Sequence, residues 1–246
     1  MYRFVDCRFD LLDPPSARRR YLEAHIPGAA FMDLDDGLSD LSIQPEVGGR
    51  HPLPSADAFA ASAGRAGIGD DTLVVAYDEG MTGGAARLWW LLRHFGHEHV
   101  AVLDGGLGAW LGPLASGEER VEPAILTPRE RTGDSVETDE ILERLGDPRL
   151  TLIDSRSLER YRGESGGLDP VAGRIPGAQS VIPDGKTLMD VPPDLLEADE
   201  IVAYCGSGVL ACVPLLALHR AGRTDARLYV GSWSEWSRKG LPAEKG

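Results

Sequence analysis

The sequence is poor in cysteine, in basic residues and in long apolar runs, and each shortage excludes a class of protein. Its 246 residues include three cysteines, too few and too scattered for a disulfide framework or a zinc site. Asp and Glu number 39 against 25 Lys and Arg, and the resulting net charge of -14 argues against nucleic acid or an anionic membrane as a partner. No apolar run approaches the roughly 20 residues that a membrane span needs.

The start of the chain also lacks the pattern of a secretory signal peptide. Residues 1–6 lead directly into an apolar, strand-like run. Together with the few cysteines, this favours a cytoplasmic protein kept in a reducing compartment. The share of hydrophobic residues, 42%, is typical of one or two globular domains with full cores.

Four short motifs occur twice in the chain, in the same order. Ordered repetition of this kind is the mark of a tandem duplication. The interval between the second and third motifs is shorter in the second half, which one deletion explains. The pairs are FVDCR at 4–8 with LIDSR at 152–156, HIPGA at 25–29 with RIPGA at 174–178, VVAYDEG at 74–80 with IVAYCGS at 201–207, and LDGGLGAW at 103–110 with YVGSWSEW at 229–236.

Each half alternates short apolar runs with helical patterns, which predicts a mainly parallel sheet covered by helices. We expect an N-terminal domain over 1–112, a polar, Pro-rich linker over 113–135 and a C-terminal domain over 136–246. The expected strands are 4–7, 73–77, 100–103, 150–154, 201–204 and 227–230, with helices near 84–95 and from 209 onward.

One strand-like run of the second half ends at Cys205. Gly206, Ser207 and Gly208 follow it and allow the backbone to turn sharply with its N–H groups directed inward. A helical pattern begins at Val209, so Cys205 faces a helix N-terminus. Unpaired N–H groups and the helix dipole both favour an anion there, and therefore a thiolate. Outside such a loop, a lone cysteine at a strand end is most often a small core residue.

The first half carries Asp78, Glu79 and Gly80 at the matching strand end. Two carboxylates in this loop would repel an anion, so we expect the first copy to be inactive. The motifs that both copies share, Asp-x-Arg and Ile-Pro-Gly-Ala, are expected to serve the fold.

These motifs, their order and the cysteine loop resemble those of the rhodanese superfamily over the whole length of the chain. The resemblance implies an α/β fold of two tandem rhodanese-like domains, each a mainly parallel sheet flanked by helices, the first inactive and the second catalytic. The loop CGSGV resembles that of the 3-mercaptopyruvate sulfurtransferase branch. Thiosulfate-using relatives carry basic residues after the cysteine, whereas Gly206 and Ser207 are neutral, and a dianionic donor needs more cations than a mercapto acid.

The same resemblance implies roles for side chains outside the loop. Arg160 has the position of the family's substrate-carboxylate arginine, with Arg162 as a second candidate. Ser207 belongs to a proton-handling group, which His25 and Asp13 of the first domain would complete. His25 also fits a purely structural role, because its turn recurs around Arg174.

The resemblance further implies that the loop backbone binds the substrate. Leu210 stands where the family commonly has Thr, and no second family arginine is found after Arg162. The residues expected to hold the anionic sulfur through their N–H groups are Gly206, Ser207, Gly208, Val209 and Leu210.

The expected reaction is a double displacement on sulfur. The Cys205 thiolate takes a sulfur atom from 3-mercaptopyruvate or thiosulfate as a persulfide, and a second nucleophile then removes it. We expect this acceptor to be cyanide, a small thiol or a protein thiol such as that of a thioredoxin-like protein. No metal and no organic cofactor is expected.

Two other functions use a cysteine loop of this type. Cysteine phosphatases and arsenate reductases need an arginine at the position of Ala211, so this alternative is disfavoured. A non-enzymatic persulfide carrier or adaptor would share the same loop, and turnover with a small sulfur donor would separate it from an enzyme.

Overall fold

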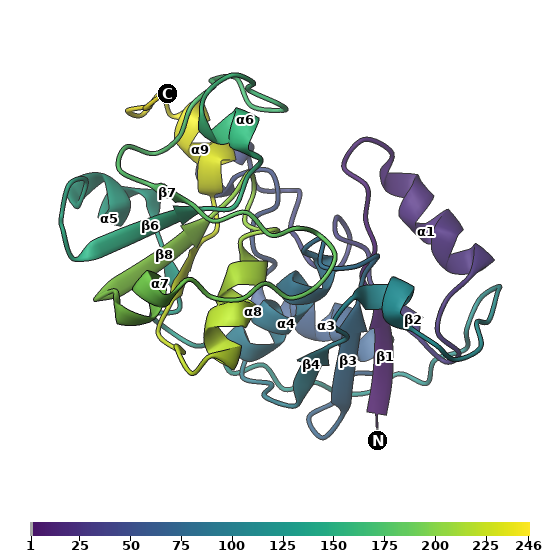
Figure 1. The fold of residues 1–246 in the computed structure, drawn as a ribbon. Coiled ribbons are helices and arrows are strands. Elements are labelled where there is room, and N and C mark those ends of the chain that lie inside the picture. Colours follow the sequence, from purple (N-terminus) through teal and green to yellow (C-terminus); the bar gives the residue numbers. More distant parts are fainter. Residues whose placement is uncertain (1) are drawn as a thin grey trace. The chain divides into compact units, whose positions relative to one another are not determined.

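The computed structural model describes residues 2–246, which form two compact units (Figure 1). Unit 1 comprises Met1–Asp40, Pro54–Arg131 and Gly185–Leu188, and unit 2 comprises Leu41–Leu53, Thr132–Asp184 and Met189–Gly246. None of the helices in residues 2–246 is long and apolar enough to cross a membrane.

Unit 1 is built on a four-stranded parallel sheet in the order β2-β1-β3-β4. Its apolar strands pair in register, with Phe4 opposite Val75 and Asp6 opposite Tyr77. The elements of unit 1 are β1 (Tyr2–Asp6), α1 (Pro14–Glu23), β2 (Ala30–Phe31), α3 (Ala56–Arg65), β3 (Leu73–Tyr77), α4 (Gly84–His94), β4 (Val100–Val102) and a short 3₁₀ helix, η1 (Gly106–Ala109).

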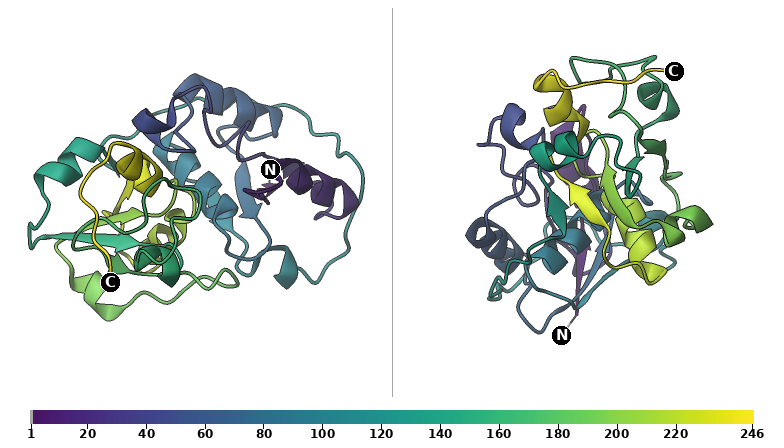
Figure 2. Two further views of the ribbon diagram at one scale, coloured as in Figure 1. Left: turned by 90° about the horizontal axis from the view of Figure 1, so that it is seen from above. Right: turned by 90° about the vertical axis from the view of Figure 1, so that its left-hand side faces the viewer.

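Unit 2 repeats this sheet and adds one strand, in the order β5-β9-β8-β6-β7. Figure 2 shows the green and yellow strands and helices of unit 2 from two further sides. All of its strand pairs are parallel, with Asp154 opposite Tyr204 where β6 and β8 end. The elements of unit 2 are α2 (Pro45–Gly48), β5 (Ser135–Val136), α5 (Thr138–Glu143), β6 (Leu150–Asp154), α6 (Leu158–Tyr161), β7 (Gln179–Ser180), α7 (Pro193–Glu197), β8 (Glu200–Tyr204), α8 (Cys212–Arg220), β9 (Arg227–Tyr229) and α9 (Ser232–Arg238).

The expected α/β fold with a mainly parallel sheet in each half is therefore confirmed. The helix after Cys205 begins at Cys212, three residues later than the pattern from Val209 predicts. Pro214 lies in the first turn of α8. Backbone N–H groups of a first turn have no partner within the helix, so the missing N–H of proline costs no hydrogen bond there. The residues before Cys212 form the turn that carries the loop back from β8.

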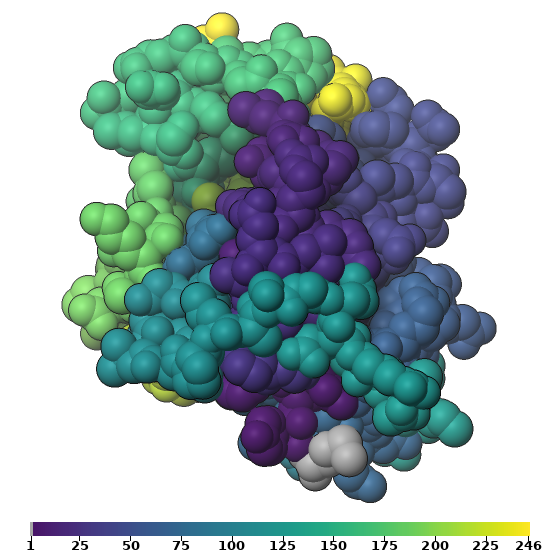
Figure 3. All heavy atoms as spheres, turned by 90° about the vertical axis from the view of Figure 1, so that its right-hand side faces the viewer, coloured from purple at the N-terminus to yellow at the C-terminus, as the bar shows by residue number. Residues whose placement is uncertain are grey.

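Two segments, residues 41–53 and 113–131, belong to other units than the predicted domain limits imply. Residues 41–53, which the sequence places in the first domain, lie in unit 2. Residues 113–131, predicted as linker, lack regular structure but run along unit 1, where the Gly117 N–H donates to the Leu22 carbonyl at 2.7 Å. Figure 3 shows this teal segment beside purple α1 on one face of unit 1. The domain limits at 112 and 136 stay predictions.

The Asp-x-Arg motif forms the same buried ion pair in both units. Asp6 pairs with Arg8 at 2.7 Å and Asp154 with Arg156 at 2.5 Å, and all four side chains are almost fully buried. In each unit the arginine also donates to a carbonyl before the Ile-Pro-Gly-Ala turn, at 2.7 Å. Although burial lowers the pKa of Arg156, its hydrogen bonds to Asp154 raise it overall. The pair fixes the carboxyl end of the first strand to the turn that follows.

We predict that Asp154→Asn lowers the free energy of unfolding of unit 2 by about 3–5 kcal/mol, because it leaves the buried Arg156 charge without its partner. Urea titration followed by tryptophan fluorescence measures the loss. Asp199→Asn, at an exposed position in the same unit, is the matched control. Equal stability of the two variants would contradict a structural role for the pair.

Candidate active site

Cys205 directly follows β8 at the carboxyl edge of the unit 2 sheet, and its side chain is almost fully buried. Its backbone is held at both ends. The N–H donates to Oγ of Ser232 at 3.1 Å, and the carbonyl accepts the N–H of Trp233 at 3.0 Å. These bonds connect the cysteine to the start of α9 and fix the direction in which its side chain leaves the strand.

Ser232 adopts a backbone conformation that favours glycine. Its φ is 53°, and the residue at the matching position of unit 1 is Gly106, with a φ of 57°. A left-handed conformation costs a non-glycine residue about 1–2 kcal/mol. The serine hydroxyl makes the bond to the Cys205 N–H and donates to the Tyr229 carbonyl at 2.9 Å. Ser232, which holds the backbone of Cys205, therefore does so in a strained backbone conformation.

The loop after Cys205 carries donors that no other part of the protein uses. Among residues 2–246, no protein acceptor takes the backbone N–H of Ser207, Val209 or Leu210. Gly208 makes the turn possible, with a φ of 74° and with a hypothetical Cβ only 2.6 Å from the Val230 carbonyl oxygen. Buried N–H groups are normally paired, so this loop is built to accept an anion.

The matching loop of unit 1 holds an anion of its own, the carboxylate of Asp78. One oxygen accepts the N–H groups of Gly80 at 3.1 Å and Thr82 at 3.4 Å, and the other those of Gly83 at 3.0 Å and Ala85 at 3.2 Å. Burial raises the pKa of Asp78, and these N–H groups act in the opposite sense. The first copy therefore lacks a free loop because Asp78 fills it, rather than because two carboxylates repel a ligand.

Ser207 has a histidine partner. Its hydroxyl lies 2.7 Å from Nδ1 of His51, and both side chains are buried. His51 comes from residues 41–53, the part of the N-terminal sequence that lies in unit 2. A hydroxyl beside an imidazole can receive and return a proton, and the proton-handling role of Ser207 stays a prediction.

Two guanidinium groups lie over the backbone next to Cys205. A Cβ placed on Gly206 would be 2.8 Å from Nη2 of Arg50 and 3.2 Å from Nη2 of Arg160. Both arginines pair with the fully buried carboxylate of Asp169, Arg160 at 2.6 Å. Burial lowers the pKa of Arg50, while Asp169 raises it and Arg160 lowers it further. The structure thus brings Arg160 to the cysteine loop, as expected, together with an arginine that was not predicted.

His25 has contacts of a structural kind within unit 1. It is fully buried, with Nδ1 2.7 Å from the carbonyl of Tyr21 and Nε2 3.3 Å from Glu119. At the matching position of unit 2, Arg174 pairs with Glu244. The equivalence supports a role for His25 in holding the turn. Its part in proton transfer stays a prediction.

The two remaining predicted residues are exposed. Asp13 forms a surface ion pair with Arg19 at 2.6 Å. Arg162 caps the end of α6, where its carbonyl accepts the N–H of Gly246 at 3.0 Å. In residues 2–246, neither Asp13 nor Arg162 forms a hydrogen bond or an ion pair with the loop of Cys205.

Arg50, His51 and Asp169 are the site residues that sequence reasoning missed. The one available signal was the length difference between the two copies, because residues 41–53 fall in the interval that is longer in the first half. Asp169 stands in a short polar loop that has no local pattern. Nothing in the sequence around these residues predicts that they meet.

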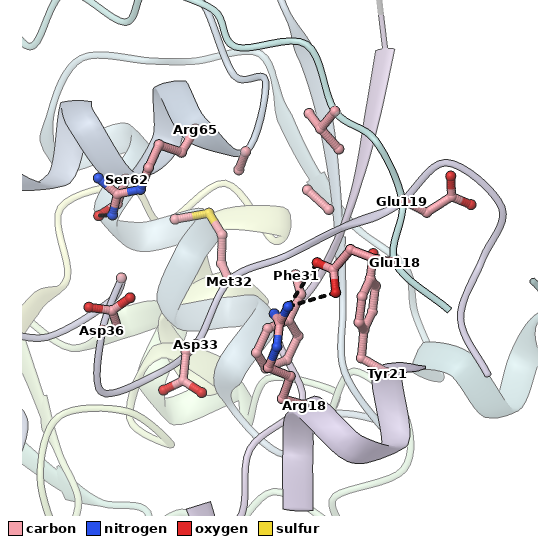
Figure 4. A pocket seen from close by; sticks show the side chains of 14 residues that line it. Arg18, Tyr21, Phe31, Met32, Asp33, Asp36, Ser62, Arg65, Glu118 and Glu119 are labelled. Carbon is pink, nitrogen blue, oxygen red and sulfur yellow. Dashed lines mark hydrogen bonds and ion pairs between the residues drawn. The ribbon is translucent and has the colours of Figure 1, made fainter. Parts of the chain in front are cut away.

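Unit 1 has a hollow of its own, shown in Figure 4, with a volume of about 230 Å³. It contains no cysteine or histidine, and Arg18 at its mouth pairs with Glu118 at 2.7 Å. In residues 2–246 no group of three or more His, Cys, Asp or Glu side chains could hold a metal ion. The hollow has the mixed charge of an ordinary polar surface.

We predict that Asp78→Ala lowers the free energy of unfolding by about 1–3 kcal/mol, because four buried N–H groups lose their acceptor. The rate at which iodoacetamide alkylates Cys205 should stay unchanged, since the loop of Cys205 belongs to unit 2. Asp71→Ala, at an exposed position, is the control in urea titration. A variant as stable as this control would show that the carboxylate does not hold the loop.

Comparison with known proteins gives one consistent result. The family described as "Rhodanese-like domain" matches residues 1–112 and 137–239. A probable 3-mercaptopyruvate sulfurtransferase of Pseudomonas aeruginosa is 43% identical over 253 residues, covering 94% of this chain and 88% of the relative. The thiosulfate sulfurtransferase of Bos taurus is 36% identical over 252 residues, covering 92% of this chain and 82% of the relative.

A solved structure agrees with these sequence relatives. SseA from Escherichia coli, a 3-mercaptopyruvate sulfotransferase with the rhodanese fold, has a TM-score of 0.77 and 30% identity over 94% of this chain and 92% of its own. Two rhodanese-like domains in one chain explain the repeated motifs, the duplicated sheets and the cysteine loop. The chain belongs to the rhodanese family, as a sulfurtransferase with two rhodanese-like domains.

Proposed function

We propose that this chain transfers sulfur from 3-mercaptopyruvate, and less efficiently from thiosulfate, to a thiol or cyanide through a persulfide on Cys205. The observation that carries the proposal is the loop of Cys205, in which three backbone N–H groups have no protein acceptor. In unit 1 the corresponding groups bind the Asp78 carboxylate, which supports an anionic occupant in unit 2 as well. A persulfide anion on Cys205 would be that occupant.

The first step forms a sulfur–sulfur bond. The Cys205 thiolate attacks the thiol sulfur of 3-mercaptopyruvate, and the carbon–sulfur bond of the donor breaks. Its electron pair remains on the three-carbon fragment as pyruvate enolate, which takes up one proton to become pyruvate. The products are the Cys205 persulfide and pyruvate, so no external oxidant or reductant is needed.

Ser207 and His51 are placed to handle the proton. We propose that the Ser207 hydroxyl gives its proton to the enolate and recovers one through His51 Nδ1, 2.7 Å away. Both side chains are buried, which limits competition from solvent. The hydroxyl lies two residues after the nucleophile, on the same loop.

Arg160 supplies the anchor for the donor carboxylate. Its guanidinium lies beside Gly206, and one of its nitrogens is occupied by Asp169. The remaining N–H groups can form paired hydrogen bonds with a carboxylate, the geometry that arginine favours. This contact would hold the donor sulfur in line with Cys205.

The second step returns the enzyme to its starting state. An acceptor thiolate or cyanide attacks the outer sulfur of the persulfide, forming a new persulfide or thiocyanate and releasing the Cys205 thiolate. We propose a thioredoxin-like protein as a physiological acceptor and a cytoplasmic location, in keeping with three cysteines that are all free.

We predict that incubation with 3-mercaptopyruvate and no acceptor adds one sulfur atom, about 32 Da, to the peptide that contains Cys205, as a double displacement requires. Peptide mass spectrometry locates the addition, and a reducing thiol should remove it. Cys7 and Cys212 should stay unmodified, because burial raises the pKa of the Cys7 thiol and the Cys212 thiol donates to the Gly208 carbonyl at 3.4 Å. Cys205→Ser should neither accept sulfur nor turn over. Sulfur on another cysteine, or turnover by this variant, would overturn the mechanism.

We predict that 3-mercaptopyruvate exceeds thiosulfate by at least about tenfold in kcat/KM, the scale of one good differential contact. The reason is that the loop itself contributes no cation at Gly206 or Ser207. Steady-state sulfur transfer to cyanide measures both donors in one assay. Equal or reversed efficiencies would contradict this preference.

A further inference from the structure

Three arginines surround the single carboxylate of Asp169. Arg50 contacts one of its oxygens and Arg160 the other at 2.6 Å, while Arg238 lies 3.5 Å from the first. Arg238 also lies 3.9 Å from Glu46. Within residues 2–246, Asp169 is the only carboxylate within ion-pair distance of Arg50 or Arg160. The cluster therefore keeps a net positive charge beside the cysteine loop.

The two arginines have hydrogen-bond donors left over. The Nε atoms of Arg50 and Arg160 are buried and have no hydrogen-bond partner in the described part of the chain. Both guanidinium groups lie close to Gly206: a Cβ placed on this residue would be 2.8 Å from Nη2 of Arg50. Buried, unsatisfied Nε donors on two partly buried cations, one residue away from the nucleophile, call for an anionic ligand with several oxygens.

The two sulfur donors differ in the negative charge that they would bring next to Arg50 and Arg160. Thiosulfate is a dianion. When the Cys205 thiolate attacks its outer sulfur, the sulfur–sulfur bond breaks and the electron pair leaves on sulfite, which keeps both charges and needs no proton. The donor 3-mercaptopyruvate carries one charge, and the charge that develops on its leaving group can be removed by protonation. The Coulomb energy of a cation scales with the charge it faces, so one arginine matters about twice as much for the dianion.

We propose that Arg50 is a specificity-determining residue of the donor site: paired with Arg160 and positioned by Asp169, it allows the site to accept the dianionic donor thiosulfate. The neutral loop provides no cation for a second negative charge, and Arg50 provides it from residues 41–53. This inference rests on the proposed sulfur transfer through Cys205. Asp169 acts as a positioning residue, because it contacts the arginines and sets where both guanidiniums point.

The test compares kcat/KM for both donors in the wild type, Arg50→Gln, Arg50→Lys and Arg149→Gln, with cyanide as acceptor. Arg50→Gln should lose about 30-fold with thiosulfate but only about fivefold with 3-mercaptopyruvate, because half the Coulomb energy corresponds to the square root of the fold-change, so the ratio of the two changes about fivefold or more. Arg50→Lys keeps the charge and should recover most of the thiosulfate activity. Arg149→Gln removes the same charge from an exposed position of unit 2 and should leave the ratio unchanged.

Two results would overturn the proposal while the sulfur-transfer function stands. One is an unchanged ratio in Arg50→Gln, and the other is a wild type that turns over 3-mercaptopyruvate but not thiosulfate. A wild type inactive with both donors would overturn the proposed function itself.

A second measurement does not depend on the folding of a variant. Added NaCl should reduce the wild-type kcat/KM for thiosulfate more steeply than that for 3-mercaptopyruvate, because salt screens a dianion more strongly. Equal salt slopes would contradict the role given to Arg50 even if Arg50→Gln did not fold.

Discussion

Backbone N–H groups that turn inward after β3 in unit 1 and after β8 in unit 2 need an anion, and both halves of this protein are arranged around that need. In unit 1 the Asp78 carboxylate meets it with four hydrogen bonds. In unit 2, Cys205 follows the end of β8. Its side chain carries no permanent charge, and three N–H groups remain without a protein acceptor. The exchange of Asp78 for Cys205 after the strand thus accompanies the change from a loop that is satisfied by its own chain to one whose N–H groups stay open to an anionic ligand.

The charge next to the loop of Cys205 is opposite in sign to the net charge of the whole chain. The protein has a net charge of -14 and nevertheless has to bind anionic donors. Arg50 and Arg160 provide positive charge within contact distance of the loop, and the buried Asp169 holds both in place. At such distances and with partial burial, a few fixed charges outweigh many screened ones on the surface.

The sequence predicts those parts of the site that depend on local pattern. The strands at 73–77 and 150–154 were expected with the bounds that the structure has, because short apolar runs and the repeated motifs indicate them directly. The position of Cys205 between a strand and a helix follows from the same kind of signal. His51 and Arg50 could not be predicted, because a histidine and an arginine in a Pro- and Gly-rich stretch acquire their partners only through tertiary packing. His25 shows the converse, since its turn is visible in the sequence but its ring contacts are not.

The path of residues 41–53 bears on how the duplicated gene has evolved. After a duplication, a copy that no longer carries the reactive residue is usually free to be lost. Here the half without Cys205 encodes the segment that packs into unit 2, with His51 against Ser207 and Arg50 against Asp169. Deleting that half would remove side chains from the half that keeps Cys205. A shortened gene that kept only the half with Cys205 would therefore encode a loop without His51 and Arg50 beside it.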